Sequence, residues 1–210
     1  SGTANAVFQN LDLVREARPD HVIVLAGDHV YKMDYSAMLA EHVANDADLT
    51  VSCLELPIED ASDFGVMAVD AGQRIVAFEE KPAHPQPIPG KPGRALASMG
   101  IYAFNTPFLL DLLERDAADT SSSHDFGRDV IPGVLDKARV FAHAFENSCV
   151  NMVGDRPYWR DVGTLDAFWE ANLDLTRAQP ELNMYDEQWP IRTLEEHLPP
   201  AKFVFPSADP

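Results

Sequence analysis

The sequence predicts an α/β protein built on an open sheet with helices on both faces. Two observations lead to this class. Segments with helical spacing of apolar residues alternate with short β-branched runs in the first 54 residues. The first of those runs is apolar throughout, as in strands that are buried on both faces of a parallel sheet. We therefore expect a mixed, mostly parallel sheet.

The first expected elements are a helix and a strand. Apolar residues at positions 7, 11 and 14 have helical spacing, and Thr3 or Asn5 could cap the start of this helix. Arg18 and Pro19 end it. The run from position 21 to Asp28 then reads as a strand buried on both faces and followed by Gly-Asp.

A second amphipathic helix begins after Asp34, which we expect to be its N-cap. Its inner face would carry Tyr35, Met38, Leu39, His42 and Val43. The later expected elements are a strand over 49–54, a hairpin over 66–69 and 74–78, a Pro-rich loop over 82–92, a strand over 97–104, a helix over 108–115, a strand over 139–145, and a helix capped by Thr164.

The ends of the chain are unlike those of a whole domain. An α/β nucleotide-binding domain usually begins with a strand and a Gly-rich turn, and neither stands at the start of this sequence. Beyond Pro180 the periodicity fails and prolines recur. We therefore expect residues 1–178 to be an N-terminally truncated domain and residues 179–210 to be an extended connector.

The composition is strongly acidic. Sixteen Lys and Arg against 34 Asp and Glu give a net charge of −18, which argues against nucleic acid or an anionic membrane as partner. No apolar run reaches the roughly 18 residues of a membrane span. The two cysteines, Cys53 and Cys149, read as reduced core thiols of a cytoplasmic protein.

Two aspartates are candidates for holding a metal ion. Asp28 follows a strand, at the sheet edge where open α/β proteins bind ligands, and Asp161 lies just before a capped helix. Together they could hold Mg²⁺, which prefers one or two carboxylates plus phosphate oxygens. Alternatively, Asp28 could cap a turn and Asp161 could favour the helix dipole.

Four further residues could contact a sugar phosphate. Lys81 is a compact charge suited to a phosphate, and Glu80 could accept hydrogen bonds from sugar hydroxyls, although a solvated run of charges is the usual explanation. Gly65 would let a ligand approach the backbone or form a bulge. Ser98 could bond a sugar or its own backbone. The histidines and cysteines lack zinc-ligand spacing, and there is no Gly-x-Ser-x-Gly nucleophile turn.

Seven segments occur in a characteristic order along the chain. They are Gly2-Thr3-Ala4, Ala26-Gly27-Asp28-His29-Val30-Tyr31, Phe64-Gly65-Val66-Met67, Glu80-Lys81-Pro82, Ser98-Met99-Gly100-Ile101-Tyr102, Ser122-Ser123-His124-Asp125-Phe126-Gly127 and Tyr158-Trp159-Arg160-Asp161-Val162-Gly163-Thr164. In this order the chain resembles the glucose-1-phosphate adenylyltransferases, the ADP-glucose pyrophosphorylases of bacterial glycogen synthesis. The resemblance continues into the tail.

The resemblance implies a Rossmann-like nucleotidyltransferase domain, here without the family's left-handed β-helix, and a homotetramer for the full-length parent. It implies an allosteric enzyme that makes ADP-glucose and pyrophosphate from ATP and glucose 1-phosphate. By motif position, Asp28 and Asp161 would hold Mg²⁺ and Lys81 would bind the sugar phosphate. Glu80, Ser98 and Gly65 would contact the glucose.

The resemblance also marks what is missing. The family's N-terminal Gly-rich loop, with its catalytic arginine and lysine, is absent here, so we expect the isolated chain to turn over negligibly. A transferase making UDP- or dTDP-glucose is an alternative, because only the Ser-Met-Gly and Trp-Arg-Asp-Val-Gly-Thr segments favour adenine. A non-catalytic regulatory subunit is another, although Asp28, Lys81 and Asp161 are all present.

Overall fold

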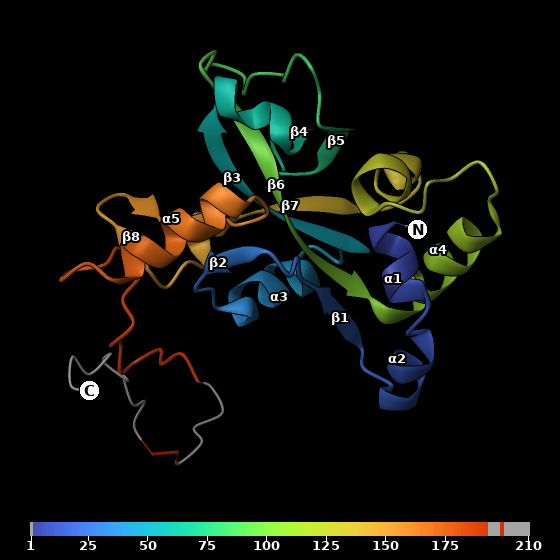
Figure 1. Cartoon of the computed structure of the whole chain (residues 1–210). Coiled ribbons are helices and arrows are strands. Elements are labelled where there is room, and N and C mark those ends of the chain that lie inside the picture. The colour runs from blue at the N-terminus through green and yellow to red at the C-terminus, as the bar shows by residue number, and fades with distance from the viewer. Residues whose placement is uncertain (1, 193–197, 200–210) are drawn as a thin grey trace, which may run out of the picture.

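A computed structural model describes residues 2–192, 198 and 199 (Figure 1). The rest of the tail, on which part of the expected connector falls, lies outside the described residues. The helices are α1 (Thr3–Phe8), α2 (Leu11–Ala17), α3 (Tyr35–Ala44), α4 (Thr106–Ala118) and α5 (Leu165–Leu175). The strands are β1 (His21–Val24), β2 (His29–Tyr31), β3 (Leu49–Pro57), β4 (Gly65–Val69), β5 (Ile75–Glu80), β6 (Arg94–Asn105), β7 (Val140–Ala144), β8 (Met152–Val153), β9 (Arg156–Pro157) and β10 (Trp159–Asp161).

The centre of the fold is a six-stranded mixed sheet in the order β5-β4-β6-β3-β7, with β1 also paired to β6. This confirms the α/β class, but the expectation of a mostly parallel sheet is wrong. The β3–β7 pair is parallel. Strands β1, β3 and β4 each pair antiparallel with β6, and β4 also pairs antiparallel with β5. The reason is that β6 runs between β1 and β3 in the opposite direction to both.

Strand β6 contains a bulge at Gly100. The bulge separates the part of β6 that pairs with β1 from the part that pairs with β4. Val51 pairs with Tyr102, whereas Cys53 pairs with Ser98, so β6 carries extra residues at this point. Gly100 has φ 66°, a left-handed conformation that glycine adopts without steric cost.

Both faces of the sheet are covered, as the sequence predicts. Alternate residues of β6 enter different apolar clusters because successive side chains of a strand point to opposite faces. Tyr102 and Phe104 pack in the cluster that includes α1, α2 and α4, whereas Met99 and Ile101 pack in the cluster that includes α3. Figure 1 shows α1 and α4 together at one end of the molecule and α3 below the sheet.

Several local expectations require correction. The first helix is broken at Gln9 and Asn10 into α1 and α2, and neither Thr3 nor Asn5 caps it: Gly2 is the N-cap, and the Thr3 hydroxyl instead accepts the backbone N–H of Phe126. Strand β1 is shorter than expected, ending at Val24. It is half-buried, because β6 is its one partner among the described residues.

The other elements agree with the expectations more closely. Asp34 caps α3 by accepting the N–H of Ser36, and Thr164 caps α5 by accepting the N–H of Ala167. On α3 the expected inward residue Val43 is instead 57% exposed. Both cysteines are free thiols, with Cys53 buried and Cys149 half-buried.

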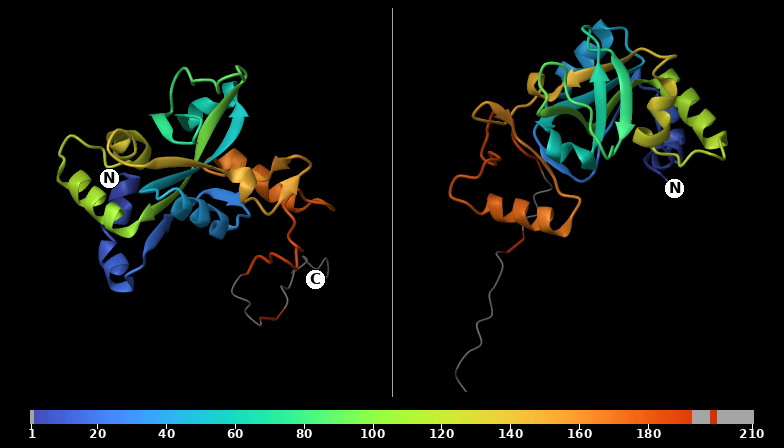
Figure 2. Two further views of the ribbon diagram at one scale, coloured as in Figure 1. Left: turned by 180° about the vertical axis from the view of Figure 1, so that it is seen from behind. Right: turned by 90° about the horizontal axis from the view of Figure 1, so that it is seen from above.

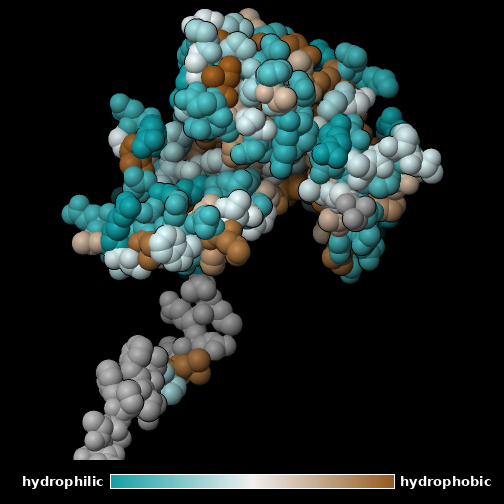
Figure 3. Space-filling model, turned by 45° about the horizontal axis from the view of Figure 1, so that its top comes forward, coloured by the Kyte–Doolittle hydropathy of each residue, from teal (hydrophilic) through white to brown (hydrophobic). Residues whose placement is uncertain are grey.

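A separate lobe is attached to one end of the sheet. It contains the two-stranded ribbon formed by β2 and β10, the short β8–β9 pair and α5. Figure 2 shows α5 standing away from the six-stranded sheet when the molecule is seen from above. Figure 3 shows a mainly hydrophilic surface that is hollowed between the main body and a lower lobe. The sequence analysis did not anticipate β2, β8, β9 or β10.

Candidate functional site

The two candidate metal-binding aspartates converge. Asp28 lies in the loop between β1 and β2, and Asp161 ends β10, which pairs antiparallel with β2 so that Asp161 stands opposite His29. A side chain placed on Gly163 would begin 3.0 Å from Asp161 Oδ1 and 3.2 Å from Asp28 Oδ2. Carboxylates far apart in the sequence thus face one small space, which the absence of a side chain on Gly163 leaves open.

The structure also tests the alternative explanations for these aspartates. Within the described residues, the Asp28 carboxylate accepts no backbone hydrogen bond, and its neighbour is His29 Nε2 at 3.6 Å. It therefore does not cap a turn. Asp161 Oδ1 accepts the N–H of Gly163 over 2.6 Å, which orients the carboxylate, while Thr164 caps α5. Thr164 is the N-cap, as expected, and the alternative that the Asp161 charge favours the dipole of α5 stays a prediction.

The residues present fit a hard divalent cation. Two carboxylates with hard oxygen donors, facing a space kept free by glycine, match the few protein ligands that Mg²⁺ takes when phosphate oxygens and waters complete its shell. No group of three or more His, Cys, Asp or Glu with ligand geometry occurs in the described part of the chain. A magnesium role for Asp28 and Asp161 remains a proposal.

The carboxylate of Glu80 lies close to the backbone of two glycines, Gly65 and Gly127. It ends β5, and its Oε2 atom would be 2.9 Å from a side chain on Gly65 and would clash with one on Gly127. Burial and the nearby charge of Asp125 raise the pKa of Glu80, against the opposing effects of Lys81 and Arg128. The structure thus brings Glu80 and Gly65 together, as expected of a shared contact surface.

Lys81 follows Glu80 in a left-handed conformation with φ 50°, and its N–H donates to the carbonyl of Phe64 over 3.0 Å. This backbone turn directs the chain out of β5 and leaves the side chain exposed. The exposure of the Lys81 side chain fits a phosphate-binding ammonium and equally a charge that is only solvated. The phosphate-binding role of Lys81 stays a prediction.

Ser98 lies in β6 directly beside the Gly100 bulge and is buried. Its hydroxyl accepts the N–H of Gly100 over 3.3 Å. The alternative of a local backbone bond for Ser98 is therefore present in the structure. The sugar-binding role of Ser98 stays a prediction.

Aromatic rings and backbone bonds connect these groups into one region. The rings of His29 and Trp159 pack edge-to-face at 4.9 Å, and Trp159 packs on Phe64 at 5.5 Å. Phe64 in turn holds the backbone of Lys81. On the other side, the N–H of Ala26 donates to the carbonyl of Gly100 over 3.1 Å. The aspartate pair, the Glu80 group and Ser98 are thereby linked.

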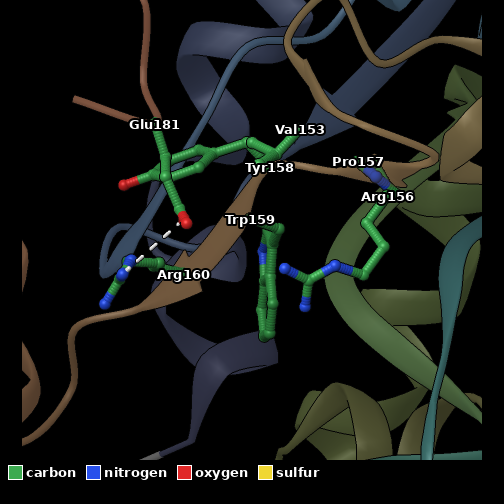
Figure 4. Close-up of a pocket in the computed structure, with 7 residues that line it drawn as sticks. All are labelled: Val153, Arg156, Pro157, Tyr158, Trp159, Arg160 and Glu181. Carbon is green, nitrogen blue, oxygen red and sulfur yellow. Dashed lines mark ion pairs between the residues drawn. The ribbon is translucent and has the colours of Figure 1, made fainter. Parts of the chain in front are cut away.

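A separate cavity of about 210 Å³ lies in the lobe (Figure 4). Figure 4 shows the indole of Trp159 standing between the guanidinium groups of Arg156 and Arg160. None of the aspartates, Glu80, Lys81 or Ser98 lines this cavity. The cavity shares Trp159 with the region of the candidate site but is not lined by the candidate residues themselves.

Sequence reasoning missed two glycines that shape the site. Gly163 leaves space between the aspartates, and Gly127 leaves space for Glu80. The available signal was a glycine two residues after an aspartate in two of the motifs: Asp161 before Gly163 and Asp125 before Gly127. In both, the aspartate accepts the N–H of the glycine.

The fold and the aspartate pair agree with the family that the sequence comparison identifies. The chain belongs to the nucleotidyl transferase family, whose sequence pattern matches residues 1–178. Within it, the similar curated relatives include glucose-1-phosphate adenylyltransferases. That of Nitrosomonas europaea is 63% identical over 209 residues, 99% of this chain and 48% of the relative. That of Methylobacillus flagellatus is 62% identical over 204 residues, 97% of this chain and 48% of the relative. The chain therefore spans about half the length of these relatives.

Proposed function

We propose that the protein to which this chain belongs makes ADP-glucose and pyrophosphate from ATP and glucose 1-phosphate. The observation that carries the proposal is the convergence of Asp28 and Asp161 at Gly163, within a nucleotidyl transferase domain. The choice of adenine and glucose follows the names of the similar relatives. Such a reaction would supply the activated sugar for glycogen synthesis.

The bond changes are those of a phosphoryl transfer. An oxygen of the sugar phosphate attacks the α-phosphorus of ATP, a new P–O bond forms, and the bond to the β-phosphate oxygen breaks to release pyrophosphate. The nucleophile is already an anion at neutral pH, so no side chain has to remove a proton. Positioning and electrostatic stabilisation are then the main contributions of the protein.

The residues divide these tasks between them. Asp28 and Asp161 would hold Mg²⁺, which when bound supplies positive charge near the phosphates. Lys81 would bind the phosphate of glucose 1-phosphate from its exposed position after β5. Glu80, ionised above its raised pKa, would accept hydrogen bonds from glucose hydroxyls, with Gly65 beside it and Ser98 on β6.

The experiment compares product formation from ATP, UTP and dTTP, and compares wild type with Asp28→Asn. The protein containing this chain should form ADP-glucose from ATP, glucose 1-phosphate and Mg²⁺, and Asp28→Asn should abolish most of that formation. Faster product formation with UTP or dTTP than with ATP would assign the UDP- or dTDP-glucose reaction instead. Equal activity of wild type and Asp28→Asn would remove the proposed role of the aspartate pair.

The proposal extends to the setting of the enzyme. We propose a cytoplasmic, allosterically regulated homotetramer without nucleic-acid or membrane partners, in keeping with the charge of −18. Over the residues that are described, no helix combines the length and apolar character needed to cross a membrane. Light scattering on the protein containing this chain would test the tetramer.

A further inference from the structure

The ribbon that carries the aspartate pair is too short to be stable by itself. Strands β2 and β10 have three residues each and do not belong to the six-stranded sheet. Isolated two-stranded ribbons are marginal in water, even when longer. Yet Asp28 precedes β2 and Asp161 ends β10. The separation of the two carboxylates therefore depends on what packs against this ribbon.

One side of the ribbon packs on the protein core. Tyr31 contacts Phe145 edge-to-face at 5.9 Å, and both Tyr31 and Trp159 pack against the apolar cluster that contains Met33 and Met99. This contact fixes the ribbon against the sheet. The charged side chains of the ribbon make their contacts with another segment.

A segment that we call the strap, residues 181–189, provides a second support. The side-chain amide of Asn151 donates to the carbonyl of Glu181 over 2.9 Å and accepts the N–H of Asn183 over 2.8 Å. Leu182 is buried. Arg160, in β10, is 3.9 Å from the carboxylate of Glu181, an ion pair drawn in Figure 4.

Lys32 joins the strap to the other strand of the ribbon. It follows Tyr31 at the end of β2, and its side chain is 3% exposed. Its ammonium donates to the carbonyl of Trp189 over 3.0 Å and to Asp186 Oδ2 over 3.3 Å. The N–H groups of Gln188 and Trp189 also donate to Asp186, and these fix the turn that presents both acceptors.

The burial of Lys32 makes this contact specific. A buried ammonium is very unfavourable unless it is paired, and both partners found here come from the strap. Partial burial favours the neutral form of Asp186, but its hydrogen bonds with Trp189 and Lys32 hold its pKa below the ordinary value. The two segments therefore need each other to satisfy their charges.

We propose that Lys32 is a positioning residue for the aspartate pair. By fixing the strap on the outer side of the ribbon, it holds β2 and β10 in the pairing that brings Asp28 and Asp161 together. It touches no reacting atom. This inference rests on the proposed function in one respect, namely that the aspartate pair binds a divalent cation.

The test is binding of Mn²⁺ alone to this chain, with free Mn²⁺ counted by electron paramagnetic resonance. Lys32→Met should raise the dissociation constant about tenfold, the effect typical of losing a group that orients metal ligands. Lys32→Arg should restore most of the affinity, because it keeps the charge and the donors. Lys91→Met is the matched control: Lys91 pairs with Glu55 at 2.6 Å on the surface, far along the chain from the ribbon, and should bind as wild type.

The direction of the change in Mn²⁺ affinity distinguishes a positioning role of Lys32 from a purely electrostatic one. Removing a nearby positive charge strengthens the binding of a cation, whereas loosening its ligands weakens it. Unchanged or tighter Mn²⁺ binding by folded Lys32→Met would overturn the inference. If that variant does not fold, Lys32→Gln removes the same positive charge but keeps a hydrogen-bond donor toward the Trp189 carbonyl, and weaker binding is again expected. A second readout is faster amide exchange at Val162, whose N–H spans the two aspartate segments.

Failure of the proposed function would look different. If Asp28→Asn binds Mn²⁺ as tightly as wild type, the aspartate pair is not the metal site, and both proposals fall. If Asp28→Asn loses binding while Lys32→Met keeps it, the metal site stands and the positioning role of Lys32 is wrong.

Discussion

The N–H of Val162 donates to the carbonyl oxygen of Asp28 over 2.8 Å. This single backbone bond joins the two segments that carry the candidate metal ligands, 133 positions apart in the sequence. Since Val162 directly follows Asp161, this bond joins the main chain beside one aspartate to the main chain of the other. The carboxylates are thus positioned by the main chain as well as by their own side-chain contacts.

Replacing Asp28 or Asp161 by asparagine should lower kcat far more than it raises KM. A metal ion that stabilises transition-state charge contributes several kcal/mol, so a loss of about a hundredfold or more in kcat is expected. Steady-state kinetics at saturating Mg²⁺ measures it. Asp12→Asn, on exposed α2, is the control and should be unchanged. A change confined to KM would contradict the assignment.

Lys81→Ala should chiefly raise KM for glucose 1-phosphate. A hydrogen bond to a charged group is worth about 1.5–3 kcal/mol, which corresponds to roughly a ten- to hundredfold weaker binding. Kinetics with glucose 1-phosphate varied at fixed ATP would show it, with exposed Lys137→Ala as control. A large fall in kcat at unchanged KM would mean that Lys81 acts in the transition state instead.

Gly127→Ala should displace Glu80 without unfolding the protein. The added methyl would clash with the Glu80 carboxylate, which ends a flexible side chain and can move away. We expect KM for glucose 1-phosphate to rise and the melting temperature to change little. Gly133→Ala is the matched control, because nothing lies within 4 Å of its added carbon. If both variants have wild-type KM, Glu80 does not contact the sugar.

Glu80→Gln should stabilise the fold at neutral pH while weakening sugar binding. Burial raises the pKa of Glu80, so the folded state holds this proton more tightly than the unfolded chain does. The ionised carboxylate therefore destabilises the fold above its raised pKa, and this cost vanishes as the pH falls towards the ordinary value near 4.3. Urea unfolding at several pH values should show a gain that shrinks on acidification. Exposed Glu79→Gln should show no gain, and an equal gain would refute the burial argument.

Asp174→Ala should detach α5 from β10. The Asp174 side chain is 8% exposed and pairs with Arg160 of β10 and, at 2.7 Å, with Arg177. Because both arginines keep access to water, we expect a modest loss of about 1–3 kcal/mol in the free energy of unfolding. Denaturant unfolding measures this, and Asp166→Ala on the exposed side of α5 serves as control. Equal stability of the two variants would show that the Asp174 pairs contribute nothing.

The long elements were predictable because their patterns are local. The hairpin of β4 and β5, the strand β6 and the helix α5 follow from alternation, periodicity and caps within single segments. The N-cap of the first helix was not, because the Thr3 hydroxyl accepts the N–H of Phe126, a residue far along the chain. Tertiary contacts of this kind leave no mark on a local pattern.

The sequence points to the candidate residues but not to the contacts that bring them together. Asp28, Glu80 and Lys81 stand out as charges that follow strand patterns, and Asp161 as a charge before a capped helix. The three-residue strands β2 and β10 are too short to produce a periodic signal, although they bring the aspartates together. The pairing of Lys32 with the strap likewise arises from residues more than 150 positions apart.

The bulge in β6 sets a limit on how members of this family can differ in size. One half of β6 supports Ser98 and β4, and the other half supports β1 and the loop that ends at Asp28. Losing or gaining one residue at Gly100 would turn one half of the strand over relative to the other, exchanging the side chains that pack in the two apolar clusters. Length variation among relatives should therefore accumulate in the proline-rich loop over 82–92 and spare the strand that follows it.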